Sequence, residues 1–176
     1  MGLSSRCPSA ARQDEVAREP AQTAFRVGVE LASLRGGIEA GRRKDAAAAL
    51  RGLRRLLGSE TLSAHLNSLE GAPPKCLPRK DFLEEIRKLE RELVSRLDPS
   101  ALALGRWAEA SRLAAASRDR RFFAEPYFRR MFSDLDDHRF PEIVERSLRE
   151  IRDAVAASRS SLKELERALR RLIRLF

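Results

Sequence analysis

The sequence predicts an all-α fold, a helical bundle of about six or seven helices. Ala, Leu, Arg and Glu dominate its 176 residues, and all four are strong helix formers. Residues that favour strands are scarce, with one Tyr and an aromatic content of only 6%. The length suits a single domain, and 43% hydrophobic with 35% charged residues is ordinary for a soluble helical protein.

The domain is expected to span residues 21–176. Residues 1–20 mix Ser, Pro and charged side chains without apolar periodicity, which predicts a disordered N-terminal tail. Apolar residues then recur at helical spacing, so a first helix is expected from 21 to 40. Gly41 is the expected stop, because glycine readily adopts the conformation that ends a helix.

The next stretch predicts one medium and one short helix. Asp45 is a suitable N-cap for a helix over 46–57, whose leucines recur at spacings of three and four. Gly58 is expected to end this helix. Ser59 can then cap a short helix that reaches about Leu69.

The clearest connector in the chain is the Pro-rich segment 71–79, an internal linker loop. Asp81 begins the next helix, and its apolar stripe is formed by Phe82, Ile86, Leu89, Leu93 and Leu97. Asp98 followed by Pro99 predicts the start of an Ala-rich helix that reaches about residue 123. Pro126 should interrupt it and leave a short aromatic helix near 127–134.

The last 36 residues carry a heptad pattern without Gly or Pro. The positions of this seam are Val144, Leu148, Ile151, Val155, Ser158, Leu162, Leu165, Leu169, Leu172 and Phe176. The favoured interpretation is one C-terminal helix over 141–176, about 54 Å long. The alternative is a break at Ser158–Ser161, since Ser161 with Glu164 can start a new helix.

The chain is strongly basic, with a net charge of +9 and 30 Arg among its 35 basic residues. Arginine binds phosphate through two donors and stacks on bases, so the excess favours an anionic partner. GC-rich coding also raises the ratio of Arg to Lys without any selection for function. The net charge itself is harder to explain in that way.

Three basic clusters are candidates for nucleic-acid binding. The first is Arg42, Arg43, Lys44, Arg51, Arg54 and Arg55. The second is Arg120, Arg121, Tyr127, Arg129 and Arg130. The third is Arg167, Arg170, Arg171 and Arg174. A solvated helix face also explains the first cluster, and favourable charge at a helix C-terminus explains the third.

Six of the ten aromatic residues lie between 118 and 140. Burial of one such side chain is worth about 1.5–3 kcal/mol, so most of them are expected in the core. Phe123, Phe128 and Phe132 are expected to point inward. Tyr127 or Phe122 could remain accessible for stacking on bases.

Motifs of common enzymes and metal sites are absent from the sequence. It has no Walker loop, nucleophile elbow, zinc knuckle or HExxH, so neither an enzyme nor a cofactor is expected. The acidic residues before His138 (134–137) suit a turn better than a metal site. Cys7 and Cys76 are not spaced as a redox pair, which fits an intracellular compartment, cytoplasmic or nucleoid/nuclear.

Two main functions follow from these patterns, and a third, an enzyme or nuclease, rests on Asp134 to His138 alone. The leading hypothesis is a non-catalytic nucleic-acid-binding protein, an accessory subunit of a larger complex, that contacts phosphates with little sequence specificity. DNA and RNA are not distinguished. The alternative is a scaffold subunit that docks a protein partner or a second copy through Leu162, Leu165, Leu169, Leu172 and Phe176. No apolar run is long enough for a membrane span, so no membrane partner is expected.

Overall fold

The computed structural model of the chain confirms the all-α class. It describes residues 10–68, 79–126, 128, 130, 131, 133, 140–156 and 161–176, with the side chains of 10–19 and 65 excepted. Every regular element within these residues is helical. The elements are α1 (Ala10–Glu39), α2 (Arg43–Leu57), the 3-10 helix η1 (Ser59–Thr61), α3 (Ala64–Ser68), α4 (Arg79–Val94), α5 (Pro99–Ala116), α6 (Arg120–Ala124), α8 (Glu142–Ala156) and α9 (Leu162–Arg174).

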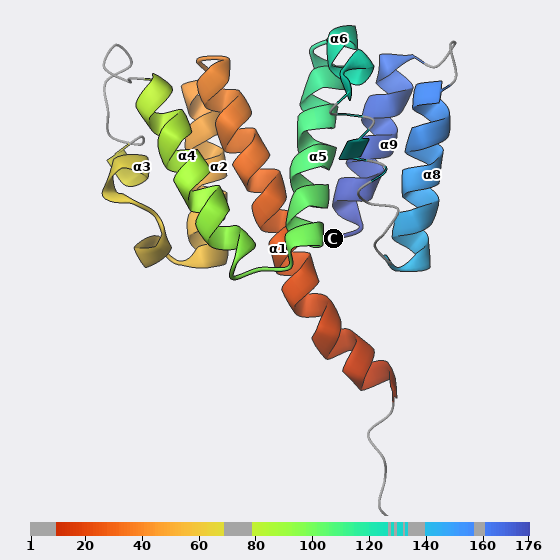
Figure 1. Cartoon of the computed structure of the whole chain (residues 1–176), viewed down its shortest axis with the longest axis horizontal. Coiled ribbons are helices and arrows are strands. Elements are labelled where there is room, and N and C mark those ends of the chain that lie inside the picture. Colours follow the sequence, from red (N-terminus) through yellow and green to blue (C-terminus); the bar gives the residue numbers. More distant parts are fainter. Residues whose placement is uncertain are drawn as a thin grey trace, which may run out of the picture.

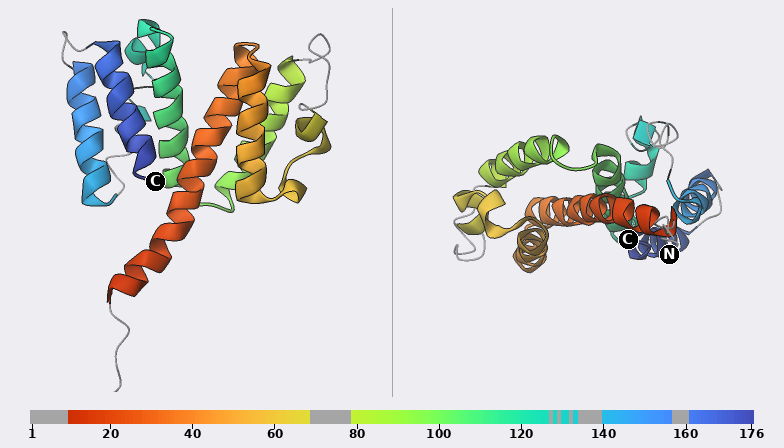
Figure 2. Two further views of the ribbon diagram at one scale, coloured as in Figure 1. Left: turned by 180° about the vertical axis from the view of Figure 1, so that it is seen from behind. Right: turned by 90° about the horizontal axis from the view of Figure 1, so that it is seen from below.

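Helix α1 is the central element of the bundle. Its most extensive contacts are with α5 and α2, and α9 packs on the other side of α5 with α8 beyond it (Figure 1). Seen from below, α2 and α9 lie on one side of α1, whereas α4 lies on the opposite side (Figure 2). Helices α2 and α9 therefore flank one face of α1, and this arrangement creates the site described below.

Two glycines allow α1 and α5 to cross at very short range. A Cβ atom at Gly28 would lie 2.3 Å from the carbonyl oxygen of Leu102, and a Cβ atom at Gly105 would lie 2.1 Å from that of Phe25. Both neighbours are backbone atoms and cannot rotate away. Ala101 and Ala108 are also buried at this crossing, as expected from the Ala-rich composition of α5.

Several expected helix boundaries agree with the structure. The side chain of Asp98 accepts hydrogen bonds from the backbone N–H groups of Ser100 and Ala101, both at 2.9 Å, and Pro99 begins α5. Gly58 follows α2 with a φ of +84°, a conformation that glycine adopts without strain. The segment expected to follow Ser59 as one helix is divided into η1 and α3.

The prediction of one helix over 141–176 is wrong. Helix α8 ends at Ala156 and α9 begins at Leu162, and the two pack against each other. The hydroxyl of Ser161 accepts from the N–H of Glu164, and the Glu164 carboxylate accepts from the N–H of Ser161. This capping box starts α9 and stabilises the break that was the alternative interpretation.

Two further boundaries differ from expectation. Helix α1 begins at Ala10, before the expected start at residue 21, and continues through Pro20, and in Figure 1 this part projects from the bundle. Helix α5 ends at Ala116, short of residue 123. Arg118 adopts a φ of +60°, and the Asp119 carboxylate accepts from the N–H of Arg121 at 3.0 Å to start α6. Residues 1–9 and most of the 71–79 linker lie outside the described residues.

The aromatic residues before 140 form part of the core. Phe128 is 1% exposed and stacks on the buried Trp107, with ring centroids 5.4 Å apart. Phe122 and Phe123 are half-buried and contact Phe128 edge to face. Phe128 therefore points inward as expected, whereas Phe132 lies outside the described residues. The burial favours a structural over a base-stacking role for this group.

Candidate nucleic-acid interface

An open groove of about 500 Å³ lies between α2 and α9, with α1 at its base. Arginines from three elements line it: Arg26 from α1, Arg55 from α2 and Arg174 from α9. Glu30 is the one acidic side chain among the lining residues, whereas three of them are arginines. The fold thus brings together members of the first and third basic clusters, which are more than a hundred residues apart in the chain.

The first cluster is divided between different surfaces. Arg55 is exposed and lines the groove, whereas Arg54 is half-buried and donates to the Asn67 side chain on α3 at 2.9 Å. Arg51, one turn before Arg55, is exposed. Arg54 is therefore directed at the neighbouring helix and does not extend the groove.

The third cluster is divided in the same way. Arg171 pairs with Glu150 on α8 at 3.3 Å, and Arg170 pairs with Glu166 within α9 at 2.6 Å. Arg174 lines the groove, and Arg167 is exposed. Of these four arginines, Arg174 alone is among the groove-lining residues.

The candidates in the turn between α1 and α2 and in α6 lie at one end of the bundle. The turn between α1 and α2 and the start of α6 are both at the upper end in Figure 1. Lys44, Arg120, Arg121 and Arg130 are exposed, Arg43 is half-buried, and Arg42 pairs with Asp45 at 3.4 Å. None of them lines the groove. Tyr127 and Arg129 lie outside the described residues.

Two residues of the groove were missed by the sequence analysis. Arg26 and Glu30 are four residues apart on α1 and have the pattern of an ordinary exposed helix pair. In the structure the Nε of Arg26 instead donates to the Phe176 carbonyl oxygen at 2.8 Å, and the side-chain amide of Gln22 donates to the same oxygen. The end of α9 is thereby held on α1.

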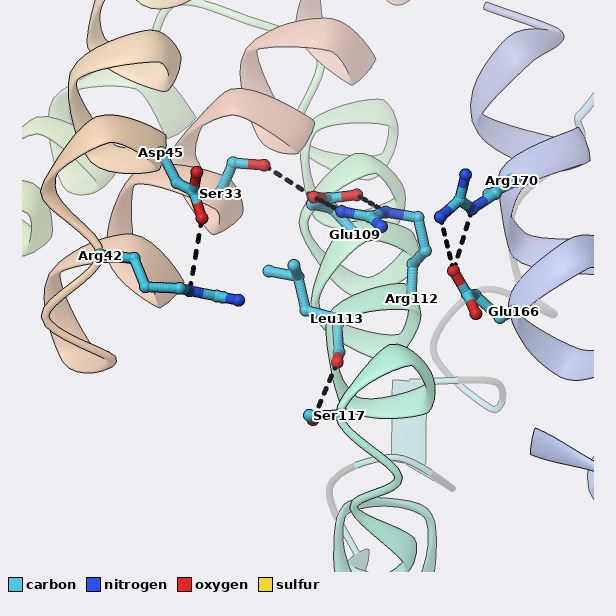
Figure 3. A network of polar contacts seen from close by, with 9 residues as sticks. All are labelled: Ser33, Arg42, Asp45, Glu109, Arg112, Leu113, Ser117, Glu166 and Arg170. Atoms are coloured by element: carbon cyan, nitrogen blue, oxygen red, sulfur yellow. Dashed lines mark hydrogen bonds and ion pairs between the residues drawn. The ribbon is translucent and has the colours of Figure 1, made fainter. Parts of the chain in front are cut away.

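A buried polar network lies next to the groove, where α1 and α5 meet (Figure 3). The hydroxyl of Ser33 donates to the Glu109 carboxylate at 2.7 Å, and Arg112 donates to both oxygens of that carboxylate at 2.6 and 2.7 Å. Glu109 is only 3% exposed. The hydrogen bond to Glu109 raises the pKa of Arg112, opposed by burial, and the charges of Glu109 and Glu166 add to the rise.

Glu30 occupies space that Gly52 leaves on α2. A Cβ atom at Gly52 would lie 2.4 Å from the Glu30 carboxylate. Burial raises the pKa of Glu30, the charge of Arg55 acts in the opposite direction, and the charge of Glu109 adds to the rise. The glycine therefore accommodates a carboxylate whose charged form is disfavoured by its surroundings.

A Glu30→Gln variant is expected to be more stable than the parent chain at pH 7. Because the pKa of Glu30 is higher in the folded chain than its ordinary value of 4.5, the folded state binds this proton more readily than the unfolded state. Stability is therefore lost as the pH rises through the window above 4.5. Urea unfolding of both proteins between pH 4 and 7 measures the effect, and a difference that does not shrink toward low pH would contradict it.

The apolar seam proposed as a partner interface is internal. Leu165, Leu169 and Leu172 are buried, Leu162 is half-buried, and Phe176 stacks on the buried Phe25 with centroids 3.9 Å apart. Two exposed apolar side chains, Ile143 and Leu175, line a second hollow of about 440 Å³, which Phe176 also lines. The leucines of the seam contribute to the core of this chain, and docking through them would require α9 to leave the bundle.

The described residues add no second class of site. Among them, no three His, Cys, Asp or Glu residues are grouped as metal ligands, and the 134–138 segment lies outside them. No helix in the same part of the chain combines the length and apolarity that a membrane crossing requires. Comparison of the chain with protein-family models, curated proteins and solved structures found no match.

Proposed function

We propose that the chain binds the phosphate backbone of a nucleic acid along the groove between α2 and α9. The observation that carries this proposal is that Arg26, Arg55 and Arg174 line one groove, whose lining includes a single acidic side chain. Arginine donors match phosphate oxygens, and such contacts give affinity with little dependence on sequence. The proposal is non-catalytic and needs no bound metal or cofactor.

Two of these arginines have guanidinium groups available to a ligand. Arg55 and Arg174 are exposed, and neither forms an ion pair with another residue that the structure describes. Neighbouring pairs such as Arg170–Glu166 and Arg171–Glu150 have exposed arginines, with 54% and 66% of the side chain accessible. Exposed pairs are worth only about 0–1 kcal/mol, so a phosphate can replace such a carboxylate at little cost.

Binding of labelled oligonucleotides, followed by fluorescence anisotropy from low to moderate salt, tests the proposal. We expect affinity to fall steeply with salt, with a slope in log–log form of about −0.7 per phosphate contacted in a single strand. The double variant Arg55→Glu/Arg174→Glu should bind at least about tenfold more weakly at the lowest salt and have a smaller slope, because two contacts are lost.

The matched control is Arg87→Glu/Arg91→Glu on α4. Both arginines are exposed, the change in net charge is the same, and α4 lies on the other side of α1 (Figure 2). This variant should keep most of the affinity. Absence of binding at the lowest salt would overturn the proposed function, and an equal loss in both variants would overturn the groove as its site.

A further inference from the structure

The floor of the groove is apolar, although its rims are basic. Val29, Leu56, Ile173 and Phe176 are half-buried and line it between the arginines. Half-buried apolar groups between two basic rims match a ligand that has phosphates at its edge and flat apolar faces at its centre. Bases of an unpaired strand offer such faces, because their rings are free to leave the stack.

We infer that this groove binds single-stranded rather than double-stranded nucleic acid, with bases against the apolar floor and phosphates at Arg55 and Arg174. This inference rests on the proposed function and specifies its ligand. A duplex presents its charged backbone outward and keeps its bases stacked inside, so it can contact the rims but not the floor. The preference for single strands therefore originates from the floor.

Phe176 is held in place before any ligand arrives. Its ring stacks on Phe25 at an interplanar angle of 12°, and its carbonyl oxygen accepts from Arg26 and Gln22. A side chain already fixed in position loses little conformational freedom when a base contacts it. The aromatic part of the floor is thus preorganised by contacts with α1.

The position of Glu30 agrees with the same ligand. Its carboxylate lies against Gly52, among the groove-lining residues, with Arg55 near it. A carboxylate repels phosphate but accepts hydrogen bonds from the amino groups of bases. In a single strand both N–H bonds of such an amino group are free, whereas a duplex uses one of them for pairing and holds the other within a groove. The arginines therefore attract phosphates to the rims, and the Glu30 carboxylate favours base edges near the floor.

The test compares 12-nucleotide single-stranded DNA, the RNA of the same sequence and the corresponding duplex at one low salt concentration. The parent chain should bind the better of the two single strands at least about tenfold more tightly than the duplex, because each stacked base adds affinity. Comparison of the two single strands shows whether DNA or RNA is the preferred ligand.

The decisive variant is Leu56→Ala/Ile173→Ala, which removes apolar side-chain atoms from the floor of the groove without changing its charge. We expect it to weaken single-strand binding about fivefold or more and to leave duplex and heparin binding unchanged, since heparin is a polyanion without bases. Leu83→Ala on α4, also a half-buried leucine, is the control and should bind as the parent does. Circular dichroism checks that each variant is folded.

Two results would overturn the inference while leaving the proposed function intact. One is duplex binding as tight as single-strand binding. The other is unchanged single-strand binding by the folded Leu56→Ala/Ile173→Ala variant, with the effect of Arg55→Glu/Arg174→Glu still present. If neither the oligonucleotides nor heparin bind at the lowest salt, the proposed function fails as well, and this is seen before the variants are compared.

Discussion

Replacement of Gly28 by alanine is expected to lower the free energy of unfolding by about 3 kcal/mol, because it overpacks the close crossing of α1 and α5. The added methyl group would lie 2.3 Å from the Leu102 oxygen and 2.9 Å from the Arg106 nitrogen, so α1 and α5 must separate. Their interface is the most extensive among the helices that the structure describes. Thermal unfolding followed by circular dichroism should show a midpoint about 6–12 °C lower.

Gly36→Ala in the same helix is the matched control. A Cβ atom there would meet only the tip of the Leu113 side chain, at 3.0 Å, and that side chain can rotate. Alanine also gains about 0.5–1 kcal/mol over glycine inside a helix, so this variant should stay within about 1 kcal/mol of the parent. Equal losses in the two variants would contradict the assignment of the effect to the close crossing of α1 and α5.

The second large effect is expected at Glu109. Glu109→Gln should lower the free energy of unfolding by about 2–3 kcal/mol, because it removes the charge that pairs with the half-buried Arg112 guanidinium. Glutamine also places an amide donor against the donors of Ser33 or Arg112, both of which now bond to the carboxylate. Urea unfolding at neutral pH measures the loss.

An exposed pair of the same type is the control for Glu109. Glu142 pairs with Arg146 at 3.1 Å, and their side chains are 80% and 64% exposed. Glu142→Gln should change stability by less than about 0.5 kcal/mol. If Glu109→Gln were equally mild, the buried network would be stabilised mainly by the packing of α1 on α5 and not by its charges.

The fold class and the strong helix signals could be predicted from the sequence because they are local. Asp98–Pro99 and Gly58 act within a few residues of their own position. As expected, Asp98–Pro99 starts a helix and Gly58 ends one. The break before Ser161 was harder, because the heptad spacing continues across it. Pairing of α8 with α9 within the chain satisfies the same apolar stripe that one long helix would offer to a partner.

The groove itself could not be predicted, because it depends on how helices are placed in space. Arg54 and Arg55 are adjacent in sequence, yet one bonds to α3 and the other lines the groove. Arg26 was missed because its neighbour on the groove, Arg174, is remote in the chain. Helical periodicity identifies which side chains share a face, but it does not identify which faces of different helices meet.

The contact between α1 and the end of α9 also has a consequence for folding. The Arg26 side chain and the Phe176 carbonyl oxygen that it binds are 150 residues apart, so the chain must close a very long loop before this contact forms. Such non-local closure slows folding relative to bundles built from neighbouring hairpins. An intermediate that contains only α1–α4 would lack the α9 wall of the groove, so ligand binding should serve as a kinetic probe of the final assembly step.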